Sequence, residues 1–288
     1  MKQLTVHRLT TFPRSGTGGC PVAVVVEPEP LTDSARHALA NQLGMLTAFI
    51  PLETPDPMPA VFFDKAGRQS EGEQALLGVF RALARTQRTI ARRVRIDTDR
   101  GVVPVQEEVF RTPDLAQVWV EVPVPMLIPV TDPLLELHTG LQISGPTGAW
   151  RAGDTLLIHG ASLAAVRGAQ LDPHVLRTVL PEGLTGLLLF SMETTSPFSD
   201  AHVRHVITRG AGQEVPASIT PNAALGVWIR AHGKTQPFLS LEQGFDAGSP
   251  SRVSVWIEAE DAAITRISVG GQVLELERIA QPWPLEQP

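Results

Sequence analysis

The stretch PASITPNAALGVWIRAHG, residues 216–233, contains a short apolar helix pattern that occurs twice in the chain. Far upstream, EGEQALLGVFRALART at 71–86 has nearly the same centre, ALLGVFRA against AALGVWIRA. In both copies the apolar residues recur at the spacing of one helix face, around Gly78 and Gly226. A pattern that returns about half a chain apart indicates an internal duplication. A chance match between two small apolar helices is the alternative.

The segments before each copy also follow one order. A helix capped at Thr32 leads to MLTAFI in the first half, and a helix capped at Asp172 leads to GLLLFS in the second. This order aligns Phe49 with Phe190 as well as the two glycines. We therefore predict two similar domains, residues 1–124 and 125–288, joined near PVPMLIPVTD.

Local patterns predict a mixed chain with more strands than helices. The first helix, 31–44, has Thr32 or Asp33 as its N-cap and ends at Gly44. Residues 131–141 are expected to be helical, and Ser162 is expected to cap a helix after the strand DTLLIH. Near the end, TRISVGGQVLELER predicts a hairpin that turns at Gly270-Gly271.

Composition sets the broad class. The chain has 288 residues, a net charge of -6, 43% hydrophobic and 19% charged residues, the balance of a globular protein. No basic field favours nucleic acid or an anionic membrane, and no apolar run reaches the length of a membrane span. Cys20 is the single cysteine, which excludes an internal disulfide. We expect a cytoplasmic protein without nucleic-acid or membrane partners.

Several motifs predict structure rather than chemistry. SGTGGCP is followed by a strand instead of a helix, which favours a turn over a phosphate loop. His202 and His205 are expected on opposite faces of a strand, so we predict no metal site. The arginines between 81 and 95 are interpreted as a solvated helix face and its C-terminal end.

Five runs, in this order from about residue 4 to 278, resemble the PhzF-like phenazine-biosynthesis isomerase family, relatives of diaminopimelate epimerase. They are FPRSGTGGCPVAVVVEP, LTDSARHALANQLGMLTAFI, GAWRAGDTLLI, HVRHVITRGAGQEVPASITPNAALGVWI and ISVGGQVLELE. The resemblance implies an α+β, diaminopimelate epimerase-like fold. Two pseudo-twofold related domains would each curl a mixed sheet around a central helix. It also implies a homodimer, no cofactor, and a cleft between the domains for a small metabolite, with both central helices pointing their N-termini into it.

The chain departs from the family at four signature positions. The family's Ser-Glu-Thr-Ala-Phe is Met-Leu-Thr-Ala-Phe at 45–49, so Leu46 replaces the glutamate that moves a proton. Gly-His has become Gly72-Glu73, and Asp-Pro-Ala-Thr-Gly-Ser has become 215–220, with Val215 for the aspartate. Gly-Gly-Asn-Pro is now 18–21, with cysteine for asparagine. The resemblance therefore implies a retained scaffold without the standard acid/base chemistry.

The candidate ligand-binding residues are those at the two helix starts, Gly72, Glu73, Ser218 and Thr220. Helix N-termini favour anions, yet N-capping is the favoured interpretation of Ser218 and Thr220, and dipole compensation that of Glu73. Glu73 is still the best candidate for a new functional acid. Two functions stay open: a non-catalytic relative that binds a small metabolite, or an active isomerase on a small carboxylated metabolite with changed catalytic residues.

Overall fold

The chain forms two compact units in a computed structural model that describes residues 3–53, 55–70, 72–86, 92–108, 117–130, 147–209, 212–261 and 263–282. The first unit comprises Met1–Gly16, Cys20–Glu121 and Gly270–Pro288, and the second Thr17–Gly19 and Val122–Val269. The boundary at Glu121 lies close to the one expected after residue 124. Two segments cross it, so the division into halves 1–124 and 125–288 stays a prediction.

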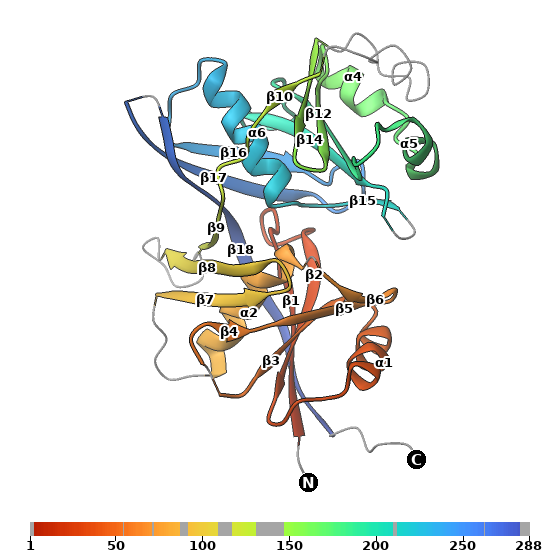
Figure 1. Cartoon of the computed structure of the whole chain (residues 1–288), viewed down its shortest axis with the longest axis vertical. Coiled ribbons are helices and arrows are strands. Elements are labelled where there is room, and N and C mark those ends of the chain that lie inside the picture. The colour runs from red at the N-terminus through yellow and green to blue at the C-terminus, as the bar shows by residue number, and fades with distance from the viewer. Residues whose placement is uncertain are drawn as a thin grey trace. The chain divides into compact units, whose positions relative to one another are not determined.

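The first unit is a mixed sheet around helix α2 (Glu73–Thr86). Its strands are β1 (Gln3–Thr11), β2 (Cys20–Glu27), β3 (Leu46–Pro51), β4 (Met58–Pro59), β5 (Val61–Asp64), β6 (Gly67–Gln69), β7 (Arg93–Thr98), β8 (Gly101–Glu108) and β9 (Gln117–Val122). Strand β2 pairs antiparallel with β1 and parallel with β3, through the crossover helix α1 (Asp33–Leu43). Figure 1 shows α2 among the strands and α1 outside, beside β5 and β6.

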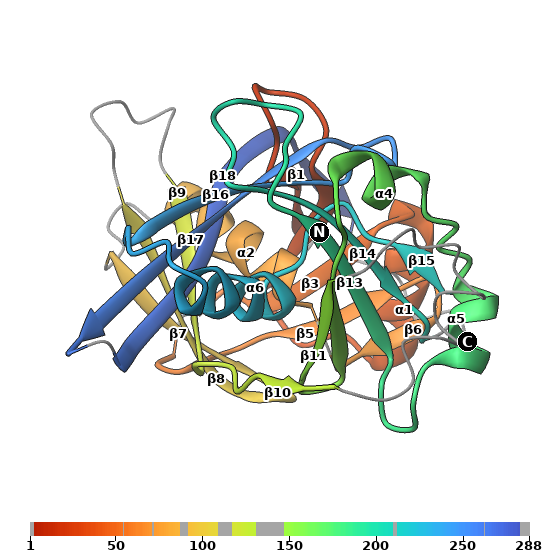
Figure 2. The ribbon, with the colours of Figure 1, turned by 90° about the horizontal axis from the view of Figure 1, so that it is seen from above.

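The second unit contains β10 (Ile128–Pro129), β11 (Gly148–Ala152), β12 (Thr155–His159), β13 (Gly186–Ser191), β14 (Ala201–Ile207), β15 (Gln213–Glu214), β16 (Phe238–Gln243) and β17 (Ser251–Glu260). Helices α4 (Leu163–Gly168) and α5 (Pro173–Val179) connect β12 to its parallel neighbour β13. Helix α6 (Thr220–Ala231) lies apart from α4 and α5 (Figure 2).

The order of strand pairings repeats between the units. In the first, an antiparallel pair β1–β2, a parallel pair β2–β3 with a helical crossover, and an antiparallel pair β3–β5 precede α2. In the second, β11–β12, β12–β13 and β13–β14 have the same three senses and precede α6. Gly78 and Gly226 accordingly lie on corresponding helices, as the repeated sequence pattern predicts.

The helix caps read from the sequence are confirmed. Thr32 Oγ1 accepts a hydrogen bond from Ala35 N at 3.2 Å, and Gly44 ends α1 with φ of 70°. Ser162 caps α4 and Asp172 caps α5 through their side-chain oxygens. Short polar side chains at these positions satisfy backbone N–H groups that have no partner inside the helix.

The hairpin expected at Gly270-Gly271 is wrong, because β18 runs unbroken from Ala263 to Pro282. A Cβ on Gly270 would lie 2.4 Å from the carbonyl oxygen of Val118 and 2.8 Å from the ring of Trp119. Glycine is therefore required for close approach to β9, which pairs with β18, and not for a turn. The helix expected at 131–141 lies outside the described residues.

The alignment of Phe49 with Phe190 is also wrong. Phe49 packs in the α1-side core with Leu4 and Val6, whereas Phe190 contacts Trp228 of α6, with ring centroids 4.8 Å apart. The two phenylalanines therefore face opposite sides of their sheets. Successive strand residues alternate faces, so a shift of one residue in the alignment is enough to cause the error.

None of the described helices combines the length and apolarity needed to cross a membrane.

Candidate functional site

Leu46 is the first residue of β3 and lies on the α2 side of the sheet. The parallel register sets it opposite Val22, and the Val22 side chain lies 3.0 Å from where a Cβ on Gly78 of α2 would be. Leu46 is half-buried. Leucine cannot exchange a proton, and the loss of the family's glutamate at this position stays a prediction.

At the start of α2, Gly72 packs closely against the ring of Phe62. A Cβ on Gly72 would lie 2.2 Å from the ring of Phe62, which is buried on β5. Ala75 N donates to the Gly72 carbonyl at 2.8 Å, which starts the helix at Glu73. Gly72 is therefore explained by packing. Glu71 lies outside the described residues.

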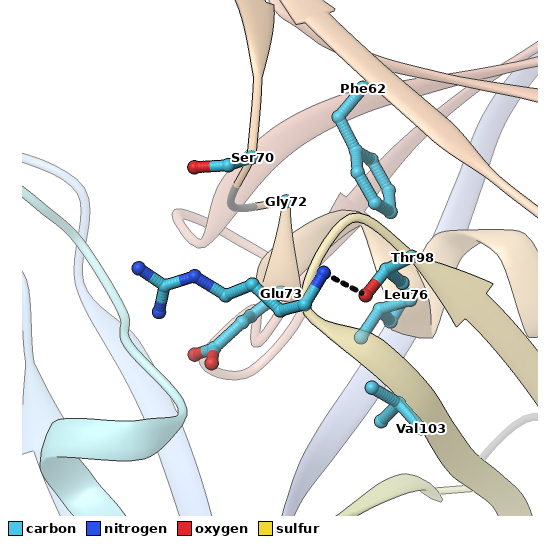
Figure 3. Close-up of a pocket in the computed structure, with 8 residues that line it drawn as sticks. Phe62, Ser70, Gly72, Glu73, Leu76, Thr98 and Val103 are labelled. Atoms are coloured by element: carbon cyan, nitrogen blue, oxygen red, sulfur yellow. Dashed lines mark hydrogen bonds between the residues drawn. The ribbon is translucent and has the colours of Figure 1, made fainter.

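A shallow hollow opens at this helix end (Figure 3). Its free space, open solvent included, is about 280 Å³, and it is lined by Phe62, Ser70, Gly72, Glu73, Leu76, Thr98, Arg100 and Val103. Thr98 Oγ1 accepts from Arg100 N at 3.2 Å and donates to the Gly101 carbonyl at 2.9 Å, which fixes the turn between β7 and β8. Two charged residues of opposite sign, Glu73 and Arg100, thus line one hollow.

Arg100 was not among the candidate site residues expected from the sequence. The signal for its turn is TDRG, residues 98–101, where Gly101 has a φ of 108°. The turn itself is visible in the sequence, but its approach to the α2 end depends on the pairing of β7 and β8.

The α6 end differs from the capped helix start that we expected. Ile219 is the N-cap residue, is fully buried, and makes no side-chain capping bond within the described chain. Thr220 is the first helical residue and is exposed. Ser218 lies one residue too early to be the cap, and its Oγ donates instead to Gln243 Oε1 at 3.3 Å. The capping interpretation of Ser218 and Thr220 is therefore corrected.

A buried network of neutral polar groups holds this end. Asn222 Nδ2 donates to the Ser218 carbonyl and to Gln243 Oε1, each at 2.7 Å. Gln243 Nε2 in turn donates to the Val215 carbonyl at 2.9 Å. Asn222 and Gln243 are completely buried, and Ser218 is 4% exposed. Asn222 and Gln243 cannot be recognised as partners from the sequence, because Gln243 comes from the end of a separate strand, β16.

Val215 completes the contrast with the resembling family. It is buried, and its backbone N–H donates to the His205 carbonyl at 2.8 Å. The α6 end therefore has a buried valine before it and a neutral network behind it, and the replacement of an aspartate by Val215 stays a prediction. Leu46, Gly72 and Glu73 lie in the first unit, and Ser218 and Thr220 in the second. The cleft expected between them stays a prediction.

Cys20 and the glycines before it have packing roles. Cys20 is a buried cysteine that forms no disulfide, and it is the first residue of β2. A Cβ on Gly18 would lie 2.1 Å from the Pro250 carbonyl oxygen, and Gly18 has a φ of 67°. The loop is followed by a strand, as expected for a turn.

The two histidines of HVRH have separate surroundings. His202 Nδ1 bonds to Glu242 at 2.9 Å and Nε2 to Asp246 at 3.2 Å. Burial raises the pKa of Glu242, but hydrogen bonds from His202 and two backbone amides outweigh it and lower the pKa overall. Burial lowers the pKa of His205 to about 4. Among the described residues, no group of three His, Cys, Asp or Glu side chains is placed to hold a metal ion.

Several arginines of the run from 81 to 95 are paired with carboxylates. Arg81 pairs with Glu107 and Arg85 with Glu275 in the first unit. The remaining described pairs in this run are Arg93 with Glu121 and Arg95 with Asp56. These pairs offset the positive charge of the run locally.

No family model and no curated protein sequence matches the chain. Solved structures match over nearly its full length. A PhzF-family phenazine biosynthesis protein of Bacillus anthracis is 18% identical, with a TM-score of 0.82, covering 97% of this chain and 99% of that one. A predicted epimerase of Pseudomonas aeruginosa is 17% identical, with a TM-score of 0.75, covering 97% and 99%.

A more distant match extends the comparison to a hydroxyproline epimerase. A hydroxyproline epimerase of Agrobacterium vitis, solved with trans-4-hydroxy-L-proline, is 10% identical, with a TM-score of 0.60, covering 98% of this chain and 94% of that one. The architecture of this chain is thus the diaminopimelate epimerase-like fold, which PhzF proteins and these epimerases share.

Proposed function

We propose that this chain is a PhzF-like isomerase-family protein that binds a small metabolite but lacks the family's standard acid/base chemistry. The observation that carries the proposal is Leu46, which lies at the start of β3 on the α2 side of the sheet. The fold supports a relationship to isomerases, and the residue at the proton-transfer position argues against their reaction. A fold alone does not determine function.

The second unit supports the same proposal. Val215 stands where the family has an aspartate, and the residues that hold the α6 end are the neutral Ser218, Asn222 and Gln243. One well-placed acid or base typically contributes about 10²–10⁴-fold to a rate. Leucine at the glutamate position and valine at the aspartate position together remove two acidic groups from the site.

We propose that the ligand binds in the cleft that the resemblance implies. Glu73 then determines which ligand charge the cleft accepts. A carboxylate in the first turn of α2 interacts favourably with the helix dipole and repels a second anion. Such helix-end effects are worth roughly 0.3–1 kcal/mol when exposed and up to ~2 kcal/mol when partly buried. The ligand is therefore a neutral or cationic metabolite instead of a simple carboxylate.

The test is isomerisation of dihydro-hydroxyanthranilate in D₂O by the wild-type chain, followed by NMR. We expect neither product nor deuterium at carbon. The matched variant Leu46→Glu restores the missing acid, and any turnover it gains over wild type would identify β3 as the former catalytic strand. Wild-type turnover at the rate of an active family member would overturn the proposal.

An active isomerase with changed residues is the second candidate. The observation in its favour is that Glu73 and Arg100 line one hollow at the α2 end, where a carboxylate could move a proton next to a fixed positive charge. If the chain turns over a carboxylated metabolite and Glu73→Gln abolishes this, the second candidate replaces the first. A homodimer and a cytoplasmic location are part of the proposal, and sedimentation of the pure protein tests the former.

A further inference from the structure

His202 is a completely buried histidine whose two ring nitrogens both contact carboxylates. Nδ1 lies 2.9 Å from Glu242 Oε1, and Nε2 lies 3.2 Å from Asp246 Oδ2. Glu242 belongs to β16, and Asp246 to the loop 244–250 that follows this strand. These three side chains form the His202 bridge, in which the ring on β14 joins the loop to the sheet.

The two contacts of the ring require two ring protons. A neutral imidazole has one N–H and one bare nitrogen, so it can donate to only one of the two carboxylates. The bare nitrogen would then face the other carboxylate, with two acceptors in contact and no proton between them, which is unfavourable in a buried place. While both acids are ionised, the ring can therefore make both hydrogen bonds only as an imidazolium.

Glu242 is held in its ionised form by several donors. Besides the ring, it accepts hydrogen bonds from the backbone N–H groups of Thr195 and Ser196. Burial raises its pKa, but the hydrogen bonds from His202 and from these two amides lower the pKa overall. A proton on Glu242 would oppose one of these donors, so the proton of the bridge belongs to the ring.

Asp246 is the partner that the ring can lose. Its side chain is 15% exposed, against 2% for Glu242, so water can replace a lost hydrogen bond there. Arg167 Nε lies 3.4 Å from Asp246 Oδ1 and Arg204 Nε lies 3.9 Å from Oδ2, which favours the ionised acid. With one proton left, the ring therefore keeps Nδ1–H for Glu242 and presents a bare Nε2 to Asp246.

The other charged side chains on the neighbouring elements have contacts away from the ring or lie on its flank. They are Asp200, which pairs with Lys234, Glu193, which accepts the N–H of Leu163, Glu214, which pairs with Arg204, and Arg252, which lies opposite Glu242 on β17. The proton on Nε2 is therefore the one whose loss changes the contact with Asp246.

The loop 244–250 supports the segment before α6. A Cβ on Gly244 would lie 2.7 Å from the Pro216 carbonyl oxygen, so the loop backbone packs directly on that segment. At the other end of the loop, Ser249 Oγ donates to the Gly19 carbonyl at 2.7 Å. Asp246 lies between these two contacts, so a loop released at Asp246 would hold both of them less firmly.

We propose that the His202 bridge is a pH-sensitive fastening of the loop 244–250. With both ring protons in place it holds the loop on the sheet, and loss of the Nε2 proton releases Asp246 and loosens the segment before α6. Raising the pH therefore opens the contact and lowering the pH closes it. This device goes beyond the proposed function and does not depend on it.

The experiment is an NMR titration of the full chain from about pH 6 to about pH 10, which follows the ring nitrogens of His202 and the backbone amides of residues 244–250. At the lower pH we expect both ring nitrogens to carry protons. As the pH rises, Nε2 should become a bare nitrogen, and the loop amides should shift with the same midpoint. Hydrogen exchange of these amides, corrected for its intrinsic pH dependence, should rise roughly tenfold across that midpoint.

His202→Gln removes the second donor, because the side-chain amide has its N–H groups on one nitrogen only. Already at the lower pH, its loop amides should have the positions that the wild type reaches at high pH, and the shared titration should disappear. His174→Gln, at an exposed histidine of α5, is the matched control and should keep the wild-type titration.

A bare ring nitrogen on His202 at about pH 6, loop amides whose midpoint differs from that of the ring, or an unchanged loop titration in His202→Gln would each overturn this inference. A ring that keeps both protons until the chain unfolds would overturn it too, because the contact would never open. The wild-type titration decides the matter even if His202→Gln does not fold. None of these measurements involves a ligand or a substrate, so their outcome is separate from that of the proposed function.

Discussion

The starts of α2 and α6 are built from opposite chemistry although the two helices share a sequence pattern. At α2 the residues are charged and reach solvent: Glu73 and Arg100 line an open hollow. At α6 they are neutral and sealed, with Asn222 and Gln243 fully buried. The shared centre of each helix is under one constraint, packing against a sheet. The ends are free of that constraint and have diverged.

This difference indicates which part of the two similar helices carries function. Gly78 and Gly226 both face a sheet, but Gly78 meets Val22 of β2, whereas Gly226 meets Val255 of β17. Even the similar centres of the two helices therefore pack on different strands. Similarity between two helices predicts their place in the fold, and their first turns must be read separately.

The largest effect is expected from Gln243→Leu at the neutral end. It takes the Gln243 amide from the Val215 carbonyl and from Ser218 Oγ, and it removes one of the acceptors of Asn222 Nδ2. Each buried unsatisfied group costs roughly 1–3 kcal/mol, so we expect the free energy of unfolding to fall by about 4 kcal/mol in urea titration. The matched variant Gln69→Leu, in the first unit, should lose less than about 1 kcal/mol. Equal losses of stability in the two variants would show that the hydrogen bonds of Gln243 contribute no more to stability than those of Gln69.

Lowering the pH should destabilise the second unit through His205, whose backbone carbonyl accepts a hydrogen bond from the N–H of Val215. Burial lowers its pKa from 6.5 to about 4, so the folded state favours the neutral ring. Stability is then complete above pH 6.5 and is lost as the pH falls toward about 4, because the unfolded chain binds the proton first. The loss is on the order of 3 kcal/mol.

His205→Gln removes this dependence. Comparing the free energy of unfolding of the variant and wild type between pH 7 and 4 isolates the contribution of the one imidazole. Parallel curves for the two proteins would contradict the role of His205 burial.

Gly72→Ala tests the charged end by steric means. The new Cβ would lie 2.2 Å from the buried Phe62 ring, and such overpacking typically costs about 1–3 kcal/mol. Thermal unfolding should show the loss. Gly168→Ala is the control, since a Cβ at Gly168 meets nothing within 4 Å. If Gly72→Ala left the thermal stability unchanged, Phe62 would move aside freely and the α2 end would not be preorganised.

Glu73→Gln should have the smallest effect on stability, a loss of roughly 0.3–1 kcal/mol from the helix dipole. Its effect on binding is expected to be clearer, up to tenfold tighter binding of benzoate by calorimetry. Weaker binding of benzoate by the variant would instead identify Glu73 as an acid that carries a proton to the ligand.

Sequence reasoning predicted the scaffold but missed how the starts of α2 and α6 are held. Caps such as Thr32 and Asp172 were readable because their partners are two or three residues away. Gln243 was not, since it reaches Asn222 only after α6 and β16 have folded together. Gly270-Gly271 was misread because two glycines fit a turn as well as a close approach to Trp119, and only the fold distinguishes these.

Strand β18 has a consequence for how the chain is made. Its last part, from Val273 to Pro282, pairs with β1 along Gln3–Thr11, so the partners in this pairing are more than two hundred residues apart in the sequence. A ribosome would release β1 and β9 long before their shared neighbour exists, with their backbone edges open to wrong partners. The first unit cannot complete its sheet before β18 has been made. It folds only after the second unit has been translated, although it comes first in the sequence.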